Sequence, residues 1–380
     1  MDAASGATED GEHREHLATP RHGAARVEAD LEQLEDIADL DLAELVTATE
    51  TGSLDEQRAA RPHRRWVLPL RIAISVAMLA ILYTRVPDFE WEGVIPEWST
   101  TSLFWLAGAA TLTVFSIVLS AVRWQQVLRA MGLRVQLRAL VPLYFAGQFV
   151  SNVLPTTIGG DVLRVSRLSR ENGDTPDTFA SVVLERLTGW LVLPLITLFG
   201  LLINPELREL GRATSLAVVI AVATLAGLAL ILFAADHPSL GGRFSAKGGW
   251  RRFIGAVHLG VDKLRHRPRA AASVIAAGLL YQFVLCLAAL MAAEAVGLTD
   301  LGLTPLLAFF PAVLIAQVLP IGISGIGVRE GAFVIFLTPL GVPPEQAVAL
   351  GLLLYLLNLV ASLLGAPAFA VGGRRRRALT

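Results

Sequence analysis

The sequence has one cysteine, and it has no histidine within its long apolar runs. The single cysteine, Cys286, lies within an apolar run, which excludes a disulfide framework and a thiolate metal site. All seven histidines fall in polar segments, which argues against a histidine proton relay within an apolar span. The chain also lacks Walker A, G-x-S-x-G and HExxH motifs. We therefore expect no metal and no cofactor, and the sequence favours a transporter over an enzyme.

Charged residues are also few. They make up 17% of the 380 residues, against about 25% in soluble domains, while hydrophobic residues make up 54%. The charge is unevenly spread, because residues 1–57 hold 16 acidic and 3 basic side chains. The remainder is basic but offers no solvated basic domain, which argues against nucleic-acid binding. These features predict an acidic, disordered tail at 1–64 attached to a membrane-embedded body.

Apolar runs of about 20 residues, the length needed to cross 30 Å of hydrocarbon, recur along the body. They predict full spans at about 66–84, 103–122, 180–203, 214–234, 270–296 and 345–371. Two other apolar segments, 140–165 and 305–341, are interrupted by Pro and Gly in NVLPTTIGGDVLR and QVLPIGISGIGVRE. Such interruptions survive in a membrane only when they are buried in protein or line a wet cavity. We expect each to form a re-entrant broken-helix hairpin.

Basic residues near the span ends predict the orientation, because Lys and Arg stay on the cytoplasmic side. Arg61–Arg65, the group Arg123, Arg129, Arg134 and Arg138, the stretch 243–269 and Arg374–Arg377 all mark cytoplasmic segments. Both termini are then cytoplasmic, and the protein is a multi-pass component of the cytoplasmic membrane. The basic stretch 243–269 carries interleaved apolar residues and predicts an amphipathic helix lying on anionic lipid.

The same counting predicts an inverted repeat, with one hairpin entering from each side. Repeat one covers about 66–203 and repeat two about 214–371, within a transmembrane domain at 65–371 that precedes a basic tail at 372–380. A shift of 165 residues aligns the two broken segments with six identities in twelve positions. The predicted fold is all-α: a polytopic membrane helical bundle with two inverted repeats, each containing a re-entrant broken-helix hairpin.

Charged and polar residues gather at these hairpins and form the predicted substrate-binding site. A buried charge at a helix centre costs about 2.5–3.5 kcal/mol on insertion scales, so these groups must pair, hydrate or lie near an interface. The predicted site consists of Asn152, Pro155, Gly159, Gly160, Asp161, Arg164, Glu185, Arg186, Gln317, Pro320, Ser324, Gly325, Gly327, Arg329 and Glu330.

Two interpretations of these charges stay open at the level of sequence. Asp161–Arg164 and Arg329–Glu330 could be local ion pairs that clamp the hairpins. Alternatively, the two arginines hold an anionic group, because a guanidinium fork matches phosphate in a bidentate way. Glu185 and Arg186 are either part of that site or snorkelling residues at the interface.

The strings GQFVSNVLPTTIGGDVLRVSRL (147–168), LERLTG (184–189) and LPIGISGIGVREGAF (320–333) occur in an order that resembles one known family. They look like the flippase-like transmembrane domain of lysylphosphatidylglycerol synthases, over about 66–371. In full-length synthases a soluble transferase domain follows this region, and we expect none in this protein. The resemblance therefore implies translocation of a lipid, which could be a phospholipid or a polyprenyl-linked sugar, and not lipid aminoacylation.

Three hypotheses follow from these observations. The first is a flippase-like transporter for an anionic lipid headgroup. The second is a membrane enzyme that transfers a sugar or acyl group on a lipid carrier, with Asp161, Glu185 or Glu330 as general base. The third is a non-transporting partner that recruits a soluble transferase through its acidic tail. The expected partners are membrane lipids with an anionic headgroup and, in the third case, that transferase.

Overall fold

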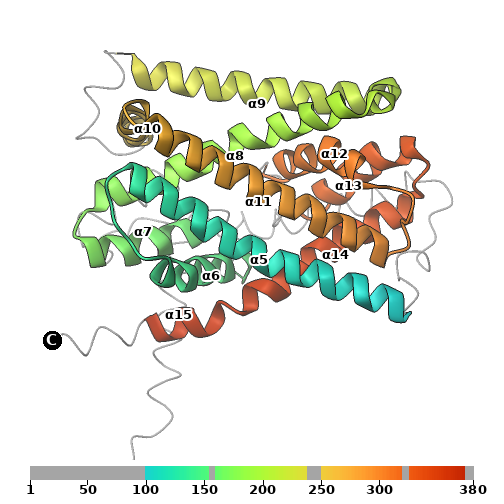
Figure 1. Ribbon diagram of the computed structural model, residues 1–380, viewed down its shortest axis with the longest axis horizontal. Coiled ribbons are helices and arrows are strands. Elements are labelled where there is room, and N and C mark those ends of the chain that lie inside the picture. Colours follow the sequence, from blue (N-terminus) through green and yellow to red (C-terminus); the bar gives the residue numbers. More distant parts are fainter. Residues whose placement is uncertain (1–98, 154–158, 238–249, 319–324, 373–380) are drawn as a thin grey trace, which may run out of the picture.

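The fold is a bundle of helices, seen in a computed structural model that describes residues 99–153, 159–237, 250–318 and 325–372 (Figure 1). Within these ranges there is no β-strand, so the all-α prediction is confirmed. The predicted span at 66–84 and the tails at 1–64 and 373–380 lie outside the described residues. The helices are α5 Thr100–Ala130, α6 Leu137–Val153, α7 Gly159–Asn172, α8 Thr175–Ile203, η3 Pro205–Glu209, α9 Arg212–Asp236, α10 Trp250–Arg265, α11 Pro268–Ala295, α12 Leu303–Ala316, α13 Val328–Leu337, η4 Thr338–Leu340, α14 Pro344–Leu363 and α15 Ala366–Gly372.

Five of the described helices, α5, α8, α9, α11 and α14, are long and apolar enough to cross a membrane. They match the predicted spans, with two corrections. Helix α5 continues to Ala130, so Arg123 lies in the helix and not in the loop that its charge predicted. The last span divides near Gly365, where the chain passes so close to the carbonyl oxygen of Phe145 that a Cβ atom would clash with it.

The two broken segments form the helix pairs α6–α7 and α12–α13, and the breaks themselves fall in residues that are not described. The pairs lie towards opposite ends of the bundle (Figure 1). In each half a long helix precedes the pair and another follows it: α5 and α8 in the first half, α11 and α14 in the second. This order agrees with the predicted repeat, while the inverted relation of the halves stays a prediction.

Close backbone contact holds the centre of the bundle together. Helix α5 packs along α11, and α8 packs along α12. At Gly200 of α8 a Cβ atom would lie 2.5 Å from the backbone nitrogen of Ala308. Only glycine permits this approach, so α8 and α12 are held at a separation that their backbones set.

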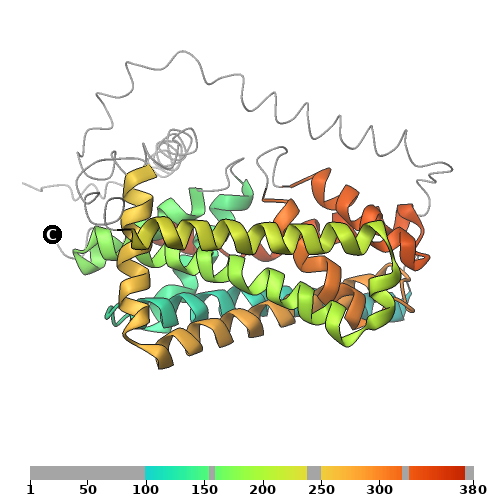
Figure 2. The same cartoon turned by 90° about the horizontal axis from the view of Figure 1, so that it is seen from above.

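The basic stretch forms α10, which crosses the ends of the long helices (Figure 2). Its apolar face is covered by protein, because Ile254, Ala256 and Val257 are buried in a cluster with Leu184 of α8. Lys263 also donates to Asp177 Oδ2 at the start of α8, at 2.6 Å. The helix prediction is therefore correct, but this apolar face packs on α8 and its neighbours and not into lipid.

Gly200→Ala should destabilise the protein, because the added methyl group meets backbone that cannot move without separating α8 from α12. Gly227→Ala in α9 is the matched control, since nothing lies within 4 Å of its Cβ position and alanine favours a helix by about 1 kcal/mol. We expect a lower unfolding temperature in detergent for Gly200→Ala and an equal or higher one for Gly227→Ala. Equal behaviour of the two variants would contradict the close contact.

Candidate functional site

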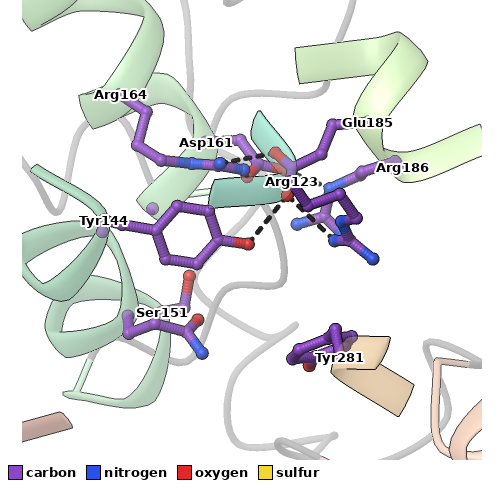
Figure 3. Close-up of a pocket in the computed structure, with 11 residues that line it drawn as sticks. Arg123, Tyr144, Ser151, Asp161, Arg164, Glu185, Arg186 and Tyr281 are labelled. Carbon is purple, nitrogen blue, oxygen red and sulfur yellow. Dashed lines mark hydrogen bonds and ion pairs between the residues drawn. The ribbon is translucent and has the colours of Figure 1, made fainter. Parts of the chain in front are cut away.

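A polar cavity of about 190 Å³ lies in the half of the bundle that contains the α6–α7 pair. Its walls are built almost wholly from charged, hydroxyl, amide and glycine residues of five helices, α5, α6, α7, α8 and α11. The lining residues are Arg123, Tyr144, Gly147, Gln148, Ser151, Gly160, Asp161, Arg164, Glu185, Arg186 and Tyr281 (Figure 3).

The carboxylate of Glu185 is the centre of this cavity (Figure 3). Arg123 Nη2 donates to its Oε1 at 2.9 Å, and Arg164 Nη1 donates to its Oε2 at 2.6 Å. The hydroxyl of Tyr144 also donates to Oε1, at 2.9 Å. The Glu185 side chain is only 1% exposed, so it does not snorkel to an interface. One buried carboxylate thus joins α5, α6, α7 and α8.

A second carboxylate, that of Asp161, extends this network. It accepts from Arg164 Nη2 at 2.5 Å through one oxygen and from Arg186 Nε through the other. The Arg186 side chain is 47% exposed and lies at the rim. The charged residues lining the cavity therefore form an alternating series of three arginines and two carboxylates, with a sum of one positive charge.

Contacts between α6 and α7 hold Arg164 in this position. Asp161 and Arg164 lie three residues apart on α7, which places them on one face of the helix. At Gly160 a Cβ atom would clash with the Gly147 carbonyl oxygen and Ser151 Oγ of α6, so the two helices touch through backbone. The Arg164 guanidinium also lies 4.4 Å from the ring centroid of Tyr144, a cation–π contact.

Arg329 and Glu330 form a separate pair at the start of α13. Arg329 Nη2 and Nε donate to Glu330 Oε1 at 2.9 and 3.1 Å, and Gly327 N–H donates to Oε2 at 2.6 Å. The Arg329 guanidinium lies 5.1 Å from the ring centroid of Tyr355. Gly351 of α14 leaves room for the Glu330 side chain. Both charges are buried, and neither residue lines the cavity.

The structure therefore divides the predicted site into groups. It brings Gly160, Asp161, Arg164, Glu185 and Arg186 together in the cavity, and Arg329 and Glu330 into the second pair. Asn152 lies on α6 and Gly159 on α7, and neither lines the cavity. In the second pair, Gly325 packs on Gln317. Gly325 and the nearby Gly327 have positive φ angles of 77° and 86°. Pro155, Pro320 and Ser324 lie outside the described residues.

Six cavity residues escaped the predicted site: Arg123, Tyr144, Gly147, Gln148, Ser151 and Tyr281. Gly147, Gln148 and Ser151 lie in α6, within a few residues of the predicted Asn152. Arg123 follows a run of 20 apolar and small residues, so its charge was interpreted as the end of the span. The string AVRWQQVLRAM could have revealed it, because its apolar residues recur at helical spacing and so predict that the helix continues past Arg123. The two tyrosines carry no signal beyond their amphipathic side chain.

These features define a class: a multi-pass, all-α membrane protein with a buried polar cavity beside a broken helix pair. Within that class, the chain belongs to the family described as the lysylphosphatidylglycerol synthase transmembrane region, which it matches over residues 68–365. This membership confirms the resemblance noted in the sequence.

Two curated relatives extend the comparison. The chain is 26% identical over 341 residues to a protein named glycosyltransferase AglD from Haloferax volcanii, covering 78% of this chain and 53% of AglD. It is 22% identical over 306 residues to a UPF0104 membrane protein from Methanothermobacter thermautotrophicus, covering 73% of this chain and 87% of that protein. The chain thus spans about half the length of AglD and most of the second relative.

Glu185→Gln should weaken the fold strongly. It removes one of two negative charges from a buried series with three arginines, and leaving a buried charge without its partner costs about 3–5 kcal/mol. The measurement is the unfolding temperature in detergent. Glu206→Gln is the control, because this glutamate is exposed on η3. Similar unfolding temperatures for the two variants would contradict the central role of Glu185.

Proposed function

We propose that this protein translocates an anionic phospholipid or lipid-linked headgroup across the cytoplasmic membrane through the polar cavity. The observation that carries the proposal is the charge of the lining, three arginines against two carboxylates. In addition, Arg123 Nε is buried and has no hydrogen-bond partner among the described residues. A phosphate supplies both the missing negative charge and the missing acceptor.

The depth of the cavity supports this proposal. Glu185 lies ten residues from the start of α8, or about 15 Å at the helical rise, and Tyr281 lies thirteen residues from the start of α11, or about 20 Å. These positions lie about one third and one half of the way along two helices that are long enough to cross the roughly 30 Å hydrocarbon layer, so we place the groups within that layer. A headgroup bound there has left the membrane surface while its acyl chains can stay in lipid.

Exchange of partners on Arg164 gives a mechanism for entry and release. Arg186 at the rim attracts the incoming anion, which then replaces Asp161 on the Arg164 guanidinium. Because Asp161 is 14% exposed and Glu185 only 1%, Asp161 is the carboxylate that can swing away. Its return expels the headgroup. Arg329 and Glu330, in the second broken helix pair, are the proposed contacts of a later stage, which first has to expose them because the Glu330 side chain is 0% exposed.

The enzyme hypothesis is less well supported. Glu185, Asp161 and Glu330 are each held by at least one arginine, and a carboxylate in such a pair is a poor general base. The Haloferax volcanii relative is named a glycosyltransferase, and we therefore keep a sugar-bearing lipid within the proposed substrate class. Membrane lipids are the proposed partners; recruitment of a soluble transferase by the tail is tested by deleting residues 1–57 and measuring transport.

Neutralising the rim arginine should slow transport without unfolding the protein. Arg186→Gln removes a half-exposed charge, so we expect a folded protein that flips fluorescent phosphatidylglycerol at least tenfold more slowly in liposomes. Arg164→Gln should do the same with an added loss of stability. A smaller effect on phosphatidylcholine is expected, since its headgroup has no net charge.

Arg134→Gln is the matched control, because Arg134 is exposed in the loop between α5 and α6. Its flipping rate should equal that of the wild type. Flipping of phosphatidylglycerol by Arg186→Gln and Arg164→Gln at the wild-type rate would contradict the proposal.

A further inference from the structure

Two polar side chains in the interior of the bundle have no hydrogen-bond partner among the described residues: Thr197 through Oγ1 and Gln282 through Nε2. Their exposed fractions are 0% and 2%. The other buried threonines among the described residues each donate to a backbone carbonyl, as Thr113 does to Ala109 O at 2.7 Å. A neighbour that could accept from Gln282 is the thiol of Cys286, which is a weak acceptor.

Contacts above and below place these two groups at one level of the bundle. Towards the cavity, a Cβ atom on Gly278 of α11 would lie 3.1 Å from Val192 of α8. Beyond them, Gly200 of α8 meets Ala308 of α12, and the Cys286 thiol points at Leu306 O of α12 at 3.9 Å. Thr197 and Gln282 fall between these contacts, in a seam formed by α8, α11 and α12.

A proline weakens α8 within one turn of Thr197. Pro194 lies inside α8 and is buried. Because proline has no N–H, it cannot donate to the carbonyl of Trp190 four residues earlier. The missing backbone hydrogen bond and the unpartnered Thr197 hydroxyl therefore lie within about one turn of each other on α8.

The seam continues directly from the cavity. Tyr281 lines the cavity and precedes Gln282 in the chain. Arg123 Nε is the third buried side-chain atom without a hydrogen-bond partner in the part of the chain that the structure describes. A Cβ atom added to Gly278 would lie 3.8 Å from Arg123 Cδ. Along α8 the seam lies twelve residues, or about 18 Å, beyond Glu185, more than half the hydrocarbon thickness.

A purely structural role does not explain these groups. A buried donor or acceptor left unpaired costs about 1–3 kcal/mol, and Val or Leu of similar shape would fill the same space without that cost. Buried polar groups that lack a partner in one state are satisfied when water or a ligand reaches them in another.

We propose that Thr197 and Gln282 form a second polar station for the lipid headgroup, which becomes hydrated during transport and hydrogen-bonds the headgroup oxygens after they leave the arginines. This inference rests on the proposed function and adds a route to it. The station carries no charge, so it can hold phosphate or hydroxyl oxygens briefly without trapping the anion as a guanidinium would.

Water access to the station can be measured without measuring transport. The chain has one cysteine, so Cys286→Ala gives a cysteine-free background in which Thr197→Cys is the sole thiol. In phosphatidylglycerol liposomes we expect a small water-soluble methanethiosulfonate to modify Thr197→Cys at least tenfold faster than Ala292→Cys, a fully buried position on α11. Mass spectrometry of the intact protein gives the rates, and equal rates would overturn the proposal.

Apolar replacements test the role in transport. For Thr197→Val and Gln282→Leu we expect an unchanged or higher unfolding temperature, and flipping of fluorescent phosphatidylglycerol at least tenfold slower than the wild type. Thr113→Val is the matched control: its hydroxyl is bonded, so the unfolding temperature should fall while flipping per folded molecule is retained. The proposal is wrong if Thr197→Val and Gln282→Leu behave like this control.

The two experiments separate the two proposals. If the wild type does not flip lipid, the proposed function fails, and the labelling rates still show whether the seam is hydrated. If the wild type flips lipid and both variants flip it equally fast, only the second station is refuted.

Discussion

The hydrogen bonds and ion pairs of the Glu185 carboxylate are the interaction on which this structure depends most. Its two oxygens accept hydrogen bonds from Arg123, Arg164 and Tyr144, and so tie three helices to α8 at a buried point beside the cavity. A charge buried this deeply is tolerated only in a full network. The same network holds one more positive than negative charge, which turns a structural joint into a candidate anion site.

The outline of the fold could be predicted from the sequence because it depends on local patterns. Apolar length gave α5, α8, α9, α11 and α14, and Pro with Gly marked both broken segments. The ion pairs Asp161–Arg164 and Arg329–Glu330 could also be predicted from the sequence, because their members are close together in the chain. For each of these, the responsible interaction lies within a few residues.

The centre of the site could not be predicted, because it depends on how distant helices pack. Arg123 and Glu185 are 62 residues apart, and nothing local indicates that they meet. The prediction placed Arg123 in a loop, because an arginine after a long apolar run usually marks the point where the span reaches water. In this structure the helix continues, because the Arg123 guanidinium is paired with the buried Glu185 carboxylate. The basic helix α10 was likewise assigned to lipid, since its apolar face gives no indication of whether protein or lipid covers it.

The contact at Gly160 has a consequence for how the molecule can change shape. Because Gly160 of α7 rests directly on the Gly147 carbonyl and the Ser151 hydroxyl of α6, we expect the two helices to move together as one unit. Any widening of the cavity then has to occur where this unit meets α8. The ion pairs Arg164–Glu185 and Arg186–Asp161 hold that boundary. The contacts that must break when the unit moves are therefore made by the same charges that would bind the headgroup.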